Sequence, residues 1–153
     1  MTVLVAGLWI YTSYMMQQSE AGFRLVFVEN NDVLISDSDI LSYNWTSQEI
    51  ALSEGSSERL IQMGDSLYSF AAGFVIRIDG EEVYRGVFRS PIMSAIPAPP
   101  KISIMFPNTV FPSSTPDDHA IRMFYPSFKP PNDQPEQNAK LADYFGRINK
   151  LTT

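Results

Sequence analysis

The chain has 153 residues, a net charge of −6 at pH 7 and no cysteine. This length supports one domain, and 44% hydrophobic residues supply enough apolar surface for a core. The lack of cysteine excludes disulfides, thiol catalysis and a lipid anchor attached through cysteine. Up to Arg89 there are twelve acidic residues against five arginines and no lysine, which disfavours binding to nucleic acid phosphates.

The amino-terminal segment is uncharged up to Glu20. A helix of nineteen residues would rise about 28 Å, close to the roughly 30 Å hydrocarbon core of a bilayer. Residues 1–19 are therefore predicted to be a membrane anchor or signal segment, with the domain outside the cytoplasm. Two alternatives stay open. The segment could be a signal peptide cleaved near Ala21, giving a secreted protein, or a buried amino-terminal helix or strand.

The segment from Phe23 to Phe106 has the patterns of strands around one helix. Strand patterns occur at residues 23–28, 33–35, 49–53, 74–78, 82–88 and 102–106. A helix is predicted to start near Ser53 or Ser56, and a capped helical turn is predicted to carry Ile40 and Leu41 inward. The predicted fold class is α+β. We expect an antiparallel sheet of four or five strands covered by a helix, with an apolar amino-terminal helix and a carboxy-terminal amphipathic helix.

The clearest local signal is the stretch GFVIRIDGEEVYRGVF at residues 73–88. Two alternating runs flank Asp79-Gly80, a pair that supplies the positive φ angles of a tight hairpin turn. A hairpin does not itself require Arg77, Tyr84 and Arg85, so these are candidate partner-binding residues. The alternative is that Tyr84 belongs to the core and the arginines pair with neighbouring glutamates.

Three phrases, VLISDSDILSYNW, EIALSEGSSERLIQM and FVIRIDGEEVYRGVF, resemble the first extracytoplasmic domain of the protein-translocase subunit SecD. The resemblance covers roughly residues 33–88, and the large repeat and the multi-helix channel of that family have no counterpart here. It implies a β-α-β-β core outside the membrane that contacts other polypeptides. It carries no catalytic residue and does not extend to ion-coupled translocation.

Beyond Ser90 the chain contains all eleven of its prolines, which favour extended segments packed over the core. A strand is predicted at HAIRMFY, and residues 132–153 are predicted to form an amphipathic helix that docks on the domain. The expected organisation is therefore a segment at 1–19, an α+β domain at 20–131 and this helix.

The sequence predicts a membrane-anchored binding or accessory domain without catalytic residues, cofactor or metal. The expected partner is a membrane protein or an extended polypeptide. The alternative is a secreted or membrane-bound hydrolase-like enzyme that uses Asp117, Asp118 and His119, with Arg122 nearby. A metal at this cluster is not expected, because metal sites need three or four converging ligands and the chain has only one histidine.

Overall fold

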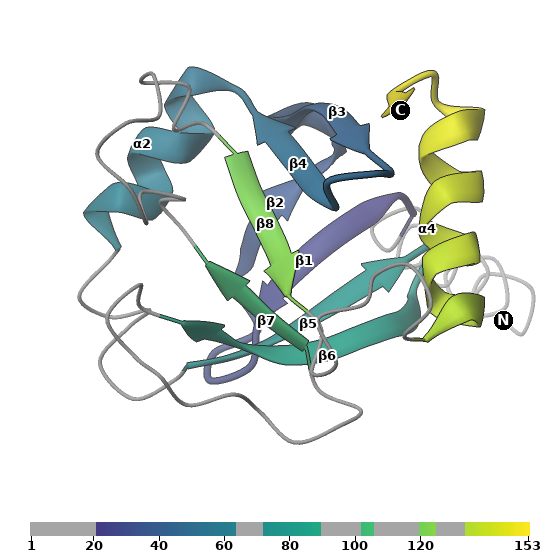
Figure 1. Ribbon diagram of the computed structural model, residues 1–153. Helices are drawn as coiled ribbons and strands as arrows, with labels where there is room; N and C mark the ends of the chain where they lie inside the picture. Colours follow the sequence, from purple (N-terminus) through teal and green to yellow (C-terminus); the bar gives the residue numbers. More distant parts are fainter. Residues whose placement is uncertain (1–20, 64–71, 90–101, 106–119, 125–133) are drawn as a thin grey trace, which may run out of the picture.

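The computed structural model describes residues 21–63, 72–89, 102–105, 120–124 and 134–153, which form a nine-stranded sheet with two α-helices (Figure 1). The strands are β1 (Phe23–Phe27), β2 (Val33–Ser36), β3 (Ile40–Asn44), β4 (Glu49–Leu52), β5 (Gly73–Ile78), β6 (Glu81–Arg89), β7 (Ile102–Met105), β8 (Ala120–Phe124) and β9 (Leu151–Thr152). The helices are the 3-10 turn η1 (Asp37–Asp39), α2 (Glu54–Gln62) and α4 (Pro135–Arg147).

The strands follow the order β2-β1-β5-β6-β7-β8-β4-β3-β9 across the sheet. The β6–β7 and β3–β9 pairs are parallel and the other six pairs are antiparallel. The sheet curls around its buried face, with α2 on one side of the molecule and α4 on the other (Figure 1). This curl lets one sheet enclose the core with little help from helices.

The predicted fold class is wrong, because the sheet has nine strands rather than four or five and is mixed rather than antiparallel. In chain order β4, α2, β5 and β6 follow one another as expected. However, β7 and β8 lie between β6 and β4, so the strands that flank α2 are not neighbours. The missed strand β3 follows an acidic turn that has a helical pattern. In β3, Ile40 is buried as predicted, but Leu41 is 63% exposed.

The apolar amino-terminal helix of the predicted fold has no counterpart in the described residues, and residues 1–19 lie outside them. Both helices that the structure describes are too short and too polar to cross a bilayer.

The predicted hairpin is confirmed. Strands β5 and β6 pair antiparallel, with Ile78 opposite Glu81, so the loop has only two residues. Asp79 and Gly80 have φ angles of 51° and 84°, as a turn with two left-handed residues requires. At the other end of the hairpin, β6 runs so close to β7 that a Cβ on Gly86 would collide with the carbonyl oxygen of Ile102.

One carboxylate joins β2, η1 and α2. Asp39 accepts hydrogen bonds from the Ser36 amide (2.7 Å), the Ser36 hydroxyl (2.8 Å) and the Ser56 hydroxyl (2.6 Å). Arg59 reaches the same carboxylate at 3.1 Å and also donates to the Leu34 carbonyl at 3.0 Å. Because β2 is an edge strand, these side chains occupy backbone groups that could otherwise pair with another strand.

Helix α4 buries one face against the inside of the curl. Leu141 and Phe145 on this face are fully buried, and the Phe145 ring lies 5.0 Å from the Tyr43 ring. Tyr84 of β6 donates a hydrogen bond to the buried Asn138 of α4. The apolar stripe and the Tyr84–Asn138 hydrogen bond thus hold α4 on the domain. In this position the exposed side of α4 lies beside the β5–β6 turn.

Candidate functional site: a groove beside α4

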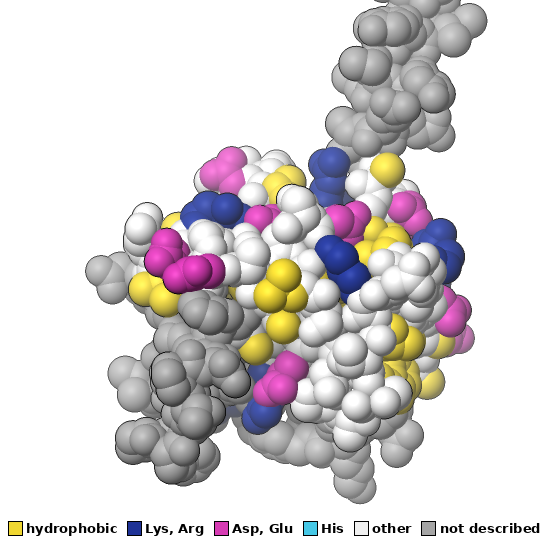
Figure 2. Space-filling model, turned by 90° about the horizontal axis from the view of Figure 1, so that it is seen from above, with side chains coloured by type: hydrophobic (Ala, Val, Ile, Leu, Met, Phe, Trp, Pro, Cys, Tyr) yellow, Lys and Arg dark blue, Asp and Glu magenta, His cyan; other side chains and the backbone are white. Residues whose placement is uncertain are grey.

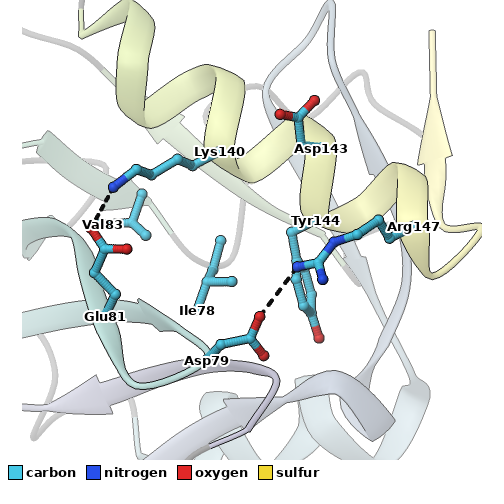
Figure 3. Close-up of a pocket in the computed structure, with 8 residues that line it drawn as sticks. All are labelled: Ile78, Asp79, Glu81, Val83, Lys140, Asp143, Tyr144 and Arg147. Atoms are coloured by element: carbon cyan, nitrogen blue, oxygen red, sulfur yellow. Dashed lines mark hydrogen bonds and ion pairs between the residues drawn. The ribbon is translucent and has the colours of Figure 1, made fainter.

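A groove lies between α4 and the tip of the β5–β6 hairpin, and Figure 3 shows its lining. Its volume is about 570 Å³. The residues that line it are Ile78, Asp79, Glu81, Val83, Lys140, Asp143, Tyr144 and Arg147. We call this feature the α4 groove.

The helix side of the α4 groove follows from helical spacing. Asp143 and Tyr144 lie three and four residues after Lys140, and Arg147 lies four and three residues after them, which places all four on one side of the helix. Tyr144 is 4% exposed and points toward the sheet, whereas the other three are exposed. The same helix thus presents a buried ring and, beside it, a row of charged groups.

The floor of the groove is apolar. Ile78 at the end of β5 and Val83 in β6 are 8% and 7% exposed, so only small parts of their side chains reach the solvent. Figure 3 shows Ile78 between the two ion pairs and Val83 beside the pair of Lys140 and Glu81. A long side chain laid in the groove would therefore meet hydrocarbon below and charge at the sides.

Two ion pairs cross the groove from α4 to the hairpin (Figure 3). Lys140 pairs with Glu81, and Arg147 pairs with Asp79 at 3.2 Å. All four side chains are at least half exposed. Pairs of this kind are worth about 0–1 kcal/mol, so a ligand can exchange with either one at little cost.

The groove is joined to the start of the domain through Asp79. The Gly22 amide donates to the Asp79 carboxylate at 2.9 Å, and the Asp79 amide donates to the Gly22 carbonyl at 3.0 Å. The hydrogen bond from Gly22 is the main cause that lowers the pKa of Asp79, and Arg147 adds to it. A residue that lines the groove therefore also holds the point where the chain enters β1.

Tyr144 makes a second connection to this point. The Phe23 amide donates to the Tyr144 hydroxyl at 3.0 Å, and that hydroxyl donates to the Asp37 carboxylate at 2.6 Å. Burial, together with the neighbouring Asp37, raises the pKa of Tyr144, so the phenol stays protonated at neutral pH. Lys150 adds to these contacts by donating hydrogen bonds to the backbone carbonyls of Asp37 and Ile40. The start of β1, η1 and the end of α4 thus form one rigid unit.

The predicted partner-binding residues do not form one surface. Tyr84 is 2% exposed and belongs to the core under α4, which is the alternative that the sequence left open. Arg85 is exposed and makes a two-pronged ion pair with Glu82. Arg77 is half-buried and lies opposite Glu82 in the hairpin register. Asp79 and Gly80 form the turn, as predicted, but Asp79 also contributes to the groove.

Of the residues of the enzyme alternative, the structure describes only Arg122. Asp117, Asp118 and His119 lie outside the described residues. Arg122 of β8 lies opposite Glu49 of β4 and makes an ion pair with it. In the part of the chain that the structure describes, no group of three histidine or acidic residues could hold a metal.

Figure 2 shows the surface of the molecule from above. Acidic and basic side chains are interspersed there among small, separate apolar groups, without a large patch of one charge among the coloured residues. The sequence alone does not reveal the groove, because the spacing of Lys140, Asp143 and Arg147 is that of the polar side of any amphipathic helix. The available signal was a pair of cations two helical turns apart and a turn with acidic residues at Asp79 and Glu81.

Comparisons with protein-family models, curated proteins and solved structures gave no match.

Proposed function

We propose that the protein is a membrane-anchored, extracytoplasmic binding domain without catalytic activity, which holds a polypeptide segment of a membrane partner in the α4 groove. The observation that carries the proposal is the groove itself: a concave, apolar floor framed by exchangeable ion pairs. Small-molecule and peptide sites share this combination of an apolar surface with a few polar groups. Four of the five charged side chains that line it form the two ion pairs, Lys140 with Glu81 and Arg147 with Asp79.

The position of the groove supports a partner in the membrane. In this proposal residues 1–19 are the anchor, which leaves residues 20–22 between the bilayer and β1. Three extended residues span at most roughly 11 Å. Because the Gly22 amide is hydrogen-bonded to Asp79 at the edge of the groove, the groove would lie within roughly 11 Å of the membrane surface. The segments of a partner that are accessible to it are those next to the partner's own membrane span.

The proposal keeps the resemblance of residues 33–88 to the SecD domain as an expectation of the same kind, since that domain also contacts polypeptides. It goes beyond the resemblance in naming the surface, because α4 lies outside the resembling region.

Site-specific photocrosslinking in native membranes tests the proposal. A photoreactive residue is placed at position 136, one helical turn before Lys140 on the exposed side of α4, so that every residue lining the groove stays in place. A matched control is placed at position 58 on α2, at the other side of the molecule (Figure 1). We expect position 136 to give one crosslinked partner, with the crosslinked peptide next to a membrane span of that partner. Equal or absent products at the two positions would refute the binding site.

Fractionation tests the anchor separately. The full-length chain is expected in the membrane fraction, and a chain that lacks residues 1–19 is expected in the soluble fraction. An uncleaved full-length chain that is soluble without detergent would contradict the anchor.

A further inference from the structure

We infer that the α4 groove selects a cationic side chain, Lys or Arg, on the polypeptide that it holds. This inference rests on the proposed function and specifies the chemistry of the bound segment. It starts from the charges of the lining. Asp79, Glu81 and Asp143 are acidic, whereas Lys140 and Arg147 are basic, so the lining has one carboxylate in excess.

The excess carboxylate is identifiable. Glu81 and Asp79 are used by the two ion pairs that cross the groove. Asp143 lies between Lys140 and Arg147 on the exposed row of α4 and makes no ion pair with any described residue. A bound cation would therefore complete the pairing at the rim.

The floor suits the rest of such a side chain. Lysine and arginine carry a hydrocarbon stem that packs on apolar surface while the charged end stays at the polar rim. Ile78 and Val83 form that apolar surface, and the ring of Tyr144 also lines the groove. An acidic side chain would instead bring a fourth negative charge to the rim, and an uncharged apolar side chain would leave Asp143 unpaired.

The charge of the whole chain favours the same occupant. A net charge of −6 attracts cationic segments over distances of about the Debye length and repels anionic ones. Anionic lipid headgroups, the other surface within reach, meet the same repulsion. The observations therefore favour a basic polypeptide segment over the bilayer surface as occupant.

The test measures binding of three fluorescent nine-residue peptides to the full-length protein in detergent micelles. The peptides share leucine-containing flanks and differ only at the central residue, which is lysine, norleucine or glutamate. We expect the lysine peptide to bind roughly two- to fivefold more tightly than the norleucine peptide, the range set by one exposed ion pair. The glutamate peptide should bind most weakly, and added salt should reduce these differences.

Variants locate the effect. Asp143→Asn should remove most of the preference for lysine, and Asp143→Glu should retain it. Glu58→Gln, on the exposed side of α2, is the matched control and should change nothing. Because Asp143 is exposed and unpaired, its replacement should leave the melting temperature unchanged.

Equal binding of the three peptides, or a lysine preference that survives in Asp143→Asn, would overturn the inferred selectivity while leaving the groove as a binding site. Failure of all three peptides to bind at millimolar concentration would overturn it too. Absence of the crosslink at position 136, where all groove residues are intact, would instead contradict the proposed function, so the two failures are distinguishable. Equal binding of the lysine peptide and of vesicles that contain anionic lipid would point to an unspecific charge effect and count against the inference.

Discussion

Replacing Asp39 by asparagine removes one negative charge from the carboxylate that joins β2, η1 and α2. Both carboxylate oxygens are used: one accepts from the amide and hydroxyl of Ser36, and the other accepts from Ser56 and Arg59. Asparagine offers only one acceptor oxygen, so its amide nitrogen must face a donor on one side. The variant therefore loses charge and at least one hydrogen bond without a large change in volume.

The size of the effect follows from the pKa of Asp39. Partial burial alone would raise this pKa, but hydrogen bonds from Ser56 and Ser36 and the contact with Arg59 outweigh burial and lower it from 3.8 to about 2. Each pKa unit corresponds to about 1.4 kcal/mol, so the folded state gains about 2 kcal/mol from the ionised carboxylate at neutral pH. Since the folded-state pKa is the lower one, this stability is fully present above about pH 4. It is lost as the pH falls toward 2.

Urea unfolding of the full-length protein between pH 2 and pH 7, compared for wild type, Asp39→Asn and the control Glu58→Gln, measures this contribution. We expect Asp39→Asn to lower the free energy of unfolding by about 2 kcal/mol at pH 7. The difference from wild type should shrink steadily below pH 4, whereas Glu58→Gln should follow wild type throughout. A deficit of Asp39→Asn that is the same at pH 2 and pH 7 would refute the assignment of the stability to this carboxylate.

Three further substitutions test the turn, the strand spacing and the docking of α4. Gly80→Val should lower the free energy of unfolding by about 1 kcal/mol or more, because a β-branched residue is strained at a φ of 84°. The control in chemical unfolding is Gly80→Asn, because asparagine tolerates this backbone conformation better. Equal losses of stability in the two variants would argue against backbone strain. Gly86→Ala should lower the free energy of unfolding by about 1–3 kcal/mol, because its Cβ would collide with the Ile102 carbonyl and lie 2.5 Å from Phe74. A melting temperature equal to that of the wild type would contradict the close spacing of β6 and β7. Tyr144→Phe keeps the ring but removes the hydroxyl between two partners. The free energy of unfolding should fall by about 1.5–3 kcal/mol, and backbone hydrogen exchange at the start of β1 should increase. Unchanged exchange there would show that the Tyr144 hydroxyl is not needed to hold this part of the chain.

Local features of the fold could be predicted from the sequence because their causes are local. The alternation in β5 and β6 and the Asp79-Gly80 pair specify a hairpin wherever the hairpin is placed. The apolar stripe through Leu141 and Phe145 specifies a helix with one buried face. In both cases a short window of residues contains the whole signal.

The sheet order could not be predicted in the same way, because it depends on which distant strands pair. The edge of β6 joins β7 rather than β4, and β8 pairs with β4 through Glu49 and Arg122, which are 73 residues apart. The two-residue strand β9 is set by its parallel contact with β3 rather than by a pattern of its own. Nothing in a local window distinguishes these pairings from the simpler antiparallel sheet.

The candidate site shows the same division. Tyr84 and Arg85 are predicted to bind a partner because they are large residues that a hairpin does not require, yet Tyr84 belongs to the core and Arg85 pairs with Glu82. The groove depends on the packing of α4 beside the hairpin, so its acidic and basic residues meet only in the folded protein. Asp79 is the one predicted residue that also lines it, and it was predicted for its turn rather than for its charge.

The position of β7 and β8 in the middle of the sheet has a consequence for synthesis on the ribosome. Strands β3 and β4 leave the ribosome early, but their connection to β1, β5 and β6 requires residues 102–105 and 120–124. Until those residues emerge, the nascent chain consists of two separate groups of strands with open apolar faces and unpaired edges. Pairings at such long separation form slowly. The two groups of strands can therefore join into one sheet only after the chain up to residue 124 has emerged.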